Sequence, residues 1–223
     1  MRLQQTIAEW EAENADRIPP NIRELTDRTV QDLISSGIAE RALGPGELAR
    51  DFRLANAHGE DIPLAGMLVH GPAVLSFQRG TWCPYARLEF EALNAIVPEL
   101  AQRGATLVGI TPDQPEMTAK FVARHPLDFE ILCDVYSRVA RRYRLLFELP
   151  EALIATYREY GADIFACEGK EHCELPMPAT YIITPAGRIH TAFVHADHRR
   201  RTEPGEILSA LDALRAREST ATG

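Results

Sequence analysis

The sequence has no long apolar run, and no stretch approaches the ~18–20 residues that a membrane-spanning helix needs. Its first segment, MRLQQTIAEWEAENADR, is charged throughout and lacks the apolar core of a secretory signal. Cysteine is scarce, with four residues in 223. Four cysteines are better explained as buried, catalytic or metal-binding thiols than as a disulfide framework. We therefore expect a protein of the cytoplasm, where thiols stay reduced.

A concentrated basic face is also missing. The net charge is −8, and the acidic residues are spread along the chain. The dense basic run His198–Arg201 is short, and a solvated loop explains it better than an anion site. Nucleic acid is therefore not an expected partner. Hydrophobic and charged contents of 45% and 25% are typical of a soluble globular protein.

The chain divides into a helical N-terminal extension and a larger body. In residues 1–43, apolar side chains recur at helical spacing, and Pro19 and Pro20 separate two helices. This extension is expected to pack on the body or on a second subunit. The body covers residues 44–217, and residues 218–223 are expected to form a flexible tail.

Strands and helices alternate along the body. Strands are expected within 51–64 around a His58-Gly59 turn, at 73–77, 105–110 and 128–132, and in a hairpin of 179–184 and 188–194. Helices are expected at about 84–102, 115–124, 135–143 and 204–217, with an inserted helix and loop at about 150–176. This order predicts an α/β fold with a mixed sheet covered on both faces, compatible with a thioredoxin-like core.

One cysteine lies where a reactive thiol would be expected. In FQRGTWCPYARLEF, Cys83 stands between an apolar strand and the start of a long helix. The thiolate is the reactive form of cysteine, and the free amides and dipole of a helix N-terminus favour negative charge. Pro84 suits the first helical turn, and Arg79 and Arg87 add positive charge. The alternative is a buried structural cysteine.

The segment VLSFQRGTWCPYARLEF resembles the active site of peroxiredoxin-like proteins of the alkyl hydroperoxide reductase/thiol-specific antioxidant (AhpC/TSA) family. In that branch the usual pattern is Arg-Gly-x-Trp-Cys-Pro-Tyr-Cys. Four later segments of this chain also resemble the family: GITPDQPE, ILCDVYSRVARRYRL, ELPMPATYIITPAGRI and EPGEILSAL. The resemblance covers about residues 40–215 and implies a thioredoxin-like fold, with a central mixed sheet flanked by helices.

The resemblance also implies roles for single residues. Cys83 would be the attacking cysteine, and Arg79 would hold the thiolate or an incoming peroxide. The active-site loop would comprise Trp82, Pro84, Tyr85, the residue at position 86, and Pro178. Pro178 would be the cis-proline of a loop that faces Cys83.

Two departures from the family pattern bear on the chemistry. Typical members carry a threonine or serine three residues before the cysteine, where its hydroxyl contacts the peroxide. Here that position is Gly80, and Thr81 is the candidate substitute. The second cysteine of the branch is replaced by Ala86, which cannot close a disulfide. The alanine is either natural or an engineered replacement that traps a state.

An oxidised Cys83 therefore needs another thiol to reduce it. Cys173 is five residues before Pro178 and would come within reach if that loop faces Cys83. Cys167 lies in the same stretch, CEGKEHCELP, and would pair with Cys173 or relay a disulfide outward. The alternative for Cys167 and Cys173 is a pair of loop cysteines without a catalytic role. Cys133 ends a buried strand and is interpreted as packing. The remaining alternative is an external small thiol or a thioredoxin-like partner.

A metal site is a weaker hypothesis. Cysteine and histidine suit zinc, and the candidates are Cys167, His172, Cys173, His190, His195, Asp197 and His198. The spacing between Cys167 and Cys173 is not the usual zinc-knuckle pattern, and the histidines lie in or beside a hairpin. We therefore expect no metal and no other cofactor.

The leading functional hypothesis is a thiol-dependent enzyme that reduces hydrogen peroxide or alkyl hydroperoxides through Cys83. One alternative is a thiol–disulfide oxidoreductase of the thioredoxin type. Another is a redox-sensing or ligand-binding module without efficient turnover. The N-terminal helices offer an apolar face, so a homodimer is expected.

Overall fold

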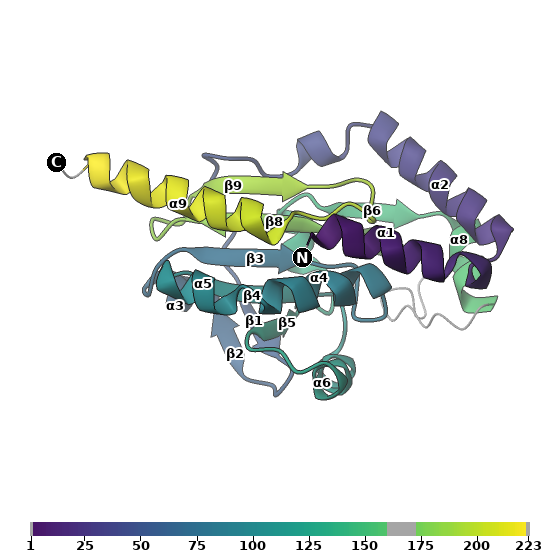
Figure 1. The fold of residues 1–223 in the computed structure, drawn as a ribbon, viewed down its shortest axis with the longest axis horizontal. Coiled ribbons are helices and arrows are strands. Elements are labelled where there is room, and N and C mark those ends of the chain that lie inside the picture. The colour runs from purple at the N-terminus through teal and green to yellow at the C-terminus, as the bar shows by residue number, and fades with distance from the viewer. Residues whose placement is uncertain (1, 160–172, 222–223) are drawn as a thin grey trace.

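The computed structural model describes residues 2–159 and 173–221. A seven-stranded sheet runs through the molecule in the order β2-β1-β5-β4-β3-β8-β9 (Figure 1). Its strands are β1 Arg53–Asn56, β2 Asp61–Pro63, β3 Ala73–Phe77, β4 Thr106–Thr111, β5 Glu130–Cys133, β8 Ala179–Ile183 and β9 Ile189–Val194. The β3–β4 and β4–β5 pairs are parallel and the other pairs are antiparallel, so the sheet is mixed, as predicted.

Helices flank the sheet (Figure 1). They are α1 Leu3–Glu13, α2 Pro20–Ser35, α3 Leu64–Leu68, α4 Pro84–Asn94, α5 Val97–Gln102, α6 Pro115–Arg124, α7 Arg138–Arg142, α8 Glu151–Glu159 and α9 Pro204–Ala221. Two 3-10 turns, η1 Ala15–Arg17 and η2 Ala39–Arg41, complete the helical segments of the extension. No helix within the described ranges is both long and apolar enough to cross a membrane.

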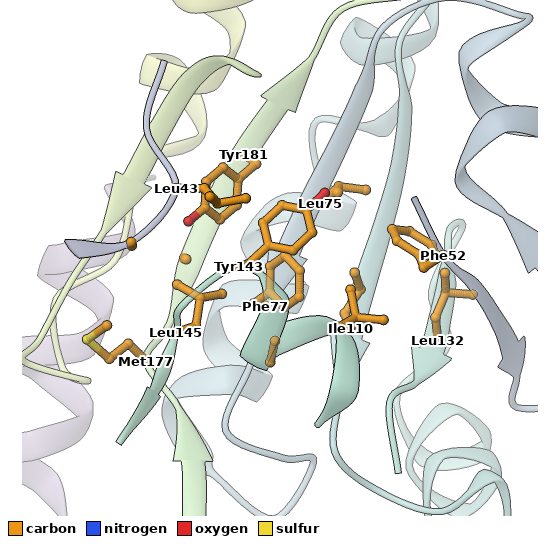
Figure 2. Close-up of a cluster of buried hydrophobic side chains, with 14 of the residues drawn as sticks. Leu43, Phe52, Leu75, Phe77, Ile110, Leu132, Tyr143, Leu145, Met177 and Tyr181 are labelled. Atoms are coloured by element: carbon orange, nitrogen blue, oxygen red, sulfur yellow. The ribbon is translucent and has the colours of Figure 1, made fainter. Parts of the chain in front are cut away.

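Both faces of the sheet are buried. Along β3, Leu75 and Phe77 belong to the large core cluster shown in Figure 2, where the side chains of Tyr143 and Tyr181 lie beside them. Val74 points to the other face and packs with residues of α4, α5 and α9. Because neighbouring strand residues point to opposite faces, an all-apolar strand such as AVLSF suits a sheet covered on both sides.

The predicted helix 84–102 is broken into two. Helix α4 ends at Asn94, the chain leaves helical geometry at Ile96, and α5 restarts at Val97 with Pro98 in its first turn. Proline has no amide hydrogen, and its ring clashes with the carbonyl four residues earlier. The break therefore falls just before Pro98 rather than at it.

Two strands at the borders of the predicted insertion were not expected from the sequence. Strands β6 (Leu146–Leu149) and β7 (Cys173–Pro176) pair as a separate antiparallel sheet on either side of α8. Each has only four residues, so its pattern is too short to distinguish from a loop. Helix α9 continues to Ala221, beyond the expected end at residue 217.

The N-terminal extension packs on the body. Helix α1 lies against α4, and α2 lies against α8 (Figure 1). The amides of Leu3 and Gln4 each donate a hydrogen bond of 2.9 Å to the carboxylate of Glu203. On α2, Asp27 accepts a hydrogen bond from Arg199 at 2.6 Å. The first of the two predicted placements, on the body, is the one observed.

Candidate active site

Cys83 occupies the N-cap position of α4, directly after the loop that leaves β3. Its carbonyl oxygen accepts the amides of Ala86 and Arg87 at 3.1 and 3.2 Å, and Pro84 fills the first helical position. The thiol makes no capping hydrogen bond, so the positive end of the helix dipole is available to a thiolate. Only 1% of Cys83 is exposed, which means that a reactant must enter the protein to reach it.

Arg79 lies in the same loop and is buried. Its guanidinium stands over the ring of Trp82, 5.3 Å from the centroid. The Nε atom has no hydrogen-bond partner among the described residues. A buried guanidinium nitrogen without a partner is costly unless something else satisfies it. Arg79 thus lies in the loop before Cys83 and stacks on Trp82, and its predicted role towards the thiolate or a peroxide stays a prediction.

Gly80 fits this loop because it has no side chain. Its φ is +144°, and a Cβ atom added there would lie 2.3 Å from Nε1 of Trp82 and 3.1 Å from Asp113. The indole thus lies where the threonine or serine of the family pattern would stand. Thr81 instead donates its amide to Asp113 at 2.5 Å. Burial raises the pKa of that carboxyl group, and hydrogen bonds from Thr81 oppose the shift.

Tyr85 joins the site to the N-terminal extension. Its hydroxyl donates to Glu11 on α1 at 2.9 Å. Its ring makes edge contacts with Trp10 at 5.5 Å and with His198 at 5.3 Å. Burial, followed by the charge of Glu11, raises the pKa of Tyr85 far above its usual value. The hydroxyl therefore stays protonated and acts as a donor.

A buried ion pair lies behind the helix that carries Cys83. Arg201 donates to Glu89 of α4 at 2.6 Å, and both side chains are almost completely buried. The same arginine donates to Gln78 at 2.5 Å and to the carbonyl of His198 at 2.9 Å. Gln78 in turn donates to Ser76 at 2.8 Å. This network ties α4 to β3 and to the segment after β9.

Cys83 lines a cavity of about 570 Å³. The body contributes Arg79, Trp82, Cys83, Pro84, Tyr85, Tyr157, His198 and Arg199 to its wall. The N-terminal extension contributes Trp10, Glu11, Ala15, Arg17, Ile18, Pro19, Ile22, Arg23, Thr26 and Asp27. We call this space the Cys83 cavity. Its size falls in the range of small-molecule sites, about 300–1,000 Å³.

The other cysteines do not line this cavity in the described part of the chain. Cys133 and Cys83 are free thiols, and Cys173 is disulfide-bonded. Cys133 donates to the hydroxyl of Thr118 at 3.3 Å, and burial raises its thiol pKa. It is thus a packing residue, as interpreted. Cys167 lies outside the described residues, and Cys173 is not a free resolving thiol here.

Pro178 was expected to precede β8 as a cis-proline. It is buried between β7 and β8, but no peptide bond in the described residues is cis. The expectation of a cis bond was therefore wrong. The trans isomer is the favoured form of X–Pro bonds, and only the family resemblance suggested otherwise. Pairing of Phe77 with Ala179 still brings Pro178 to the end of the sheet from which the Cys83 loop departs.

The candidate metal ligands do not converge. Among residues 2–159 and 173–221, no three His, Cys, Asp or Glu side chains form a group that could hold a metal ion. Asp197 bonds Arg199 at 2.8 Å, and His198 packs on Tyr85. Burial lowers the pKa of His195. His172 lies outside the described residues.

Replacing His198 with glutamine should reduce the loss of stability in acid. Burial, followed by the charges of Arg79, Arg201 and Arg199, lowers the pKa of His198 well below 6.5. Below about pH 6.5, His198 binds a proton in the unfolded chain but stays neutral in the folded protein. The free energy of unfolding therefore falls by up to ~1.4 kcal/mol per pH unit. Urea unfolding at about pH 7 and pH 5 should therefore show a smaller drop for His198→Gln. The exposed His58→Gln is the control, and an unchanged drop in His198→Gln would contradict the prediction.

Sequence reasoning missed several residues around Cys83. The sequence predicts a solvated loop for the His198–Arg201 run, yet His198 and Arg201 are buried; His198 lines the Cys83 cavity, and Arg201 pairs with Glu89. Glu89 and Asp113 were not singled out. A carboxylate such as Glu89 inside the apolar face of a helix was the available signal, because a buried charge needs a partner. That partner could not be named from the sequence.

Comparisons with known proteins place the chain among sequence relatives. The AhpC/TSA family model matches residues 45–192. The protein called peroxiredoxin bcp in Helicobacter pylori is 31% identical over 166 residues, which are 74% of this chain and 96% of that protein. The thiol-disulfide oxidoreductase ResA of Halalkalibacterium halodurans is 31% identical over 102 residues, or 45% of this chain and 57% of that protein.

A solved structure extends the likeness to the fold. The peroxidoxin BcpB from Mycobacterium tuberculosis matches 77% of this chain and 97% of its own, with a TM-score of 0.60 and 22% identity. The predicted thioredoxin-like fold and thiol-dependent redox enzyme are confirmed. The match to residues 45–192 and the bcp relative together show that the chain belongs to the AhpC/TSA family.

Proposed function

We propose that Cys83 is the attacking cysteine of this enzyme and that it reduces hydrogen peroxide or alkyl hydroperoxides. The observation that carries the proposal is the position of Cys83, at a helix N-terminus and inside a cavity that Arg79 also lines. The helix dipole stabilises a thiolate. The free Nε donor of Arg79 is suited to a peroxide oxygen or to the thiolate.

The reaction needs only these groups and a reductant. The thiolate sulfur attacks the terminal oxygen of the hydroperoxide, so that an S–O bond forms as the O–O bond breaks. The sulfur is oxidised by two electrons to a sulfenic acid, and the alkoxide or hydroxide takes a proton from water. A second thiol then attacks the sulfur, forms a disulfide and releases water. A further thiol reduces that disulfide and restores Cys83.

We propose that the second thiol is external, from a low-molecular-weight thiol or a thioredoxin-like protein. Ala86 removes the nearest internal candidate. Cys133 and Cys173 do not line the cavity, and Cys173 is already disulfide-bonded. The homodimer and the cytoplasmic location remain predictions, and light scattering can test the first.

Mixing the reduced protein with micromolar hydrogen peroxide should give a fast fluorescence change that depends on Cys83. The chain has two tryptophans, and both Trp10 and Trp82 line the Cys83 cavity. Oxidation of the sulfur changes the charge beside both rings. Stopped-flow fluorescence should therefore show a single phase whose rate rises linearly with peroxide.

The controls separate this function from its alternatives. Cys83→Ser should lose the phase completely, and Cys133→Ser should keep it. A phase that appears with small disulfides but not with peroxides would favour the thiol–disulfide oxidoreductase, the reaction named for ResA. A missing phase with both reagents would favour a binding or sensing module.

A further inference from the structure

The N-terminal extension builds more than half of the wall of the Cys83 cavity. Its contribution runs from Trp10 to Asp27, along α1, η1 and the first half of α2. These residues lie outside the segment 45–192 that matches the family. Figure 1 shows both helices on the side of the molecule where α4 and α8 lie. The extension is therefore positioned to choose what reaches Cys83.

The wall is mostly apolar and partly aromatic. Trp82 and Tyr157 meet with ring centroids 6.0 Å apart, and Trp10 meets Tyr85 at 5.5 Å. Ile18, Pro19 and Ile22 add aliphatic surface from the extension. Hydrogen peroxide needs little of this space and none of this apolar surface. The lining suits an organic body, because apolar area removed from water stabilises binding.

The carboxylates of the wall have hydrogen-bond donors, whereas two of its arginines have no carboxylate partner among the described residues. Its carboxylates are already engaged: Asp27 accepts from Arg199, and Glu11 accepts from Tyr85. Among residues 2–159 and 173–221, Arg17 donates only to the amide oxygen of Asn14, at 3.2 Å. Arg23 donates to the backbone carbonyls of Ala15 and Ile18.

Within the described part of the chain, no carboxylate therefore pairs with Arg17 or Arg23. Both arginines are exposed, while Arg79 is buried with an unpartnered Nε. The cavity thus offers guanidinium groups at its outer edge and one beside Cys83, separated by apolar surface. Guanidinium groups recognise carboxylates through paired hydrogen bonds.

We propose that the Cys83 cavity selects an apolar organic hydroperoxide that carries a carboxylate, which Arg17 and Arg23 bind. This inference rests on the proposed function and adds the class of substrate. The carboxylate lies at the outer arginines, the organic body lies along the aromatic wall, and the hydroperoxide group meets Cys83. The sulfur takes the terminal oxygen, and the product is the corresponding carboxylated alcohol.

The test compares three peroxides: hydrogen peroxide, cumene hydroperoxide, and cumene hydroperoxide with a para-carboxylate. The tryptophan signal gives the second-order rate constant for each. The carboxylated probe should react at least about fivefold faster than the neutral probe at low salt, and added salt should reduce this ratio. Equal rate constants for the two organic probes would overturn the inference. If none of the three oxidises Cys83 rapidly, the proposed function itself fails.

Variants locate the selectivity. The double variant Arg17→Gln/Arg23→Gln should lose most of the ratio, since an exposed ion pair contributes about two- to fivefold. Arg28→Gln is the matched control, because Arg28 lies on the same helix, pairs with Glu24 and does not line the cavity. An equal loss in Arg28→Gln would show general electrostatic attraction and would overturn the assignment.

Binding can be measured without any redox step. In Cys83→Ser, para-carboxylated cumyl alcohol should change the tryptophan fluorescence at lower concentration than cumyl alcohol does. The double variant should remove this difference. The other outcome is that a carboxylate speeds only the reduction of the oxidised enzyme by a thiol and not its oxidation by a peroxide. The cavity would then bind the reductant, and the substrate inference would be overturned.

Discussion

Replacing Arg201 with methionine is expected to lower the free energy of unfolding by about 3–5 kcal/mol, the usual cost of removing one partner of a buried ion pair. The change leaves the carboxylate of Glu89, which is 2% exposed, without its cation. It also removes the hydrogen bonds to Gln78 and to the carbonyl of His198. Urea unfolding followed by circular dichroism measures the loss.

A second substitution separates the stranded charge from the lost contacts. Arg201→Met/Glu89→Gln should be more stable than Arg201→Met, because no unpaired charge stays buried. Arg103→Met is the matched control, since its pair with Asp212 lies on the surface and should contribute little. Similar losses in Arg103→Met and Arg201→Met would contradict the importance of burial.

Because the pair holds α4, Arg201→Met should also change the chemistry. Glu89 lies on the helix whose first turn carries Cys83, and Gln78 lies in the loop before it. Without urea, and at a temperature where the variant is fully folded, the rate of Cys83 oxidation should fall. Arg201 is thus a positioning residue, and a normal rate in a folded Arg201→Met would rule out this role.

The second large effect is expected for Gly80→Thr, which introduces the side chain of the family pattern. A φ of +144° is rarely adopted by residues with a side chain, and the new Cβ would stand 2.3 Å from the indole of Trp82. The backbone strain alone costs about 1–3 kcal/mol. The ring must also move, and it then leaves its contact with Arg79. We expect lower stability, a shifted tryptophan emission spectrum and slower oxidation of Cys83.

Gly59→Ala is the matched control for the backbone term. Gly59 has a φ of +82° and open space where a Cβ would be added. It should lose stability without changing the fluorescence of the Cys83 cavity. If Gly80→Thr instead keeps the wild-type spectrum and oxidises faster, the indole is not fixed in place as the structure has it.

The local features of the site could be predicted from the sequence. A five-residue apolar strand, a short loop and Pro84 in a first helical turn define the junction that holds Cys83, and all lie within a dozen residues or so. Gly59 likewise marked its turn. Such features depend on neighbouring residues, so the pattern of the chain carries them directly.

The rest of the site depends on residues far apart in the chain. Arg201 meets Glu89 across 112 positions, and Tyr85 meets Glu11 across 74. Charge alone made the His198–Arg201 run look solvated, because the sequence does not show which element covers it. The same holds for the extension, whose helices could be predicted but whose place over Cys83 could not.

The hydrogen bonds of Leu3 and Gln4 to Glu203 have a consequence for synthesis. The residue before helix α1, Arg2, makes no capping hydrogen bond, and the carboxylate of Glu203 accepts the first amides of the helix instead. Ribosomes release the N-terminal part first, at about 5–20 residues per second. The nascent chain therefore carries Cys83 for several seconds before Glu203 emerges and α1 can settle over it. Until then, α1 lacks the carboxylate that accepts its first amides.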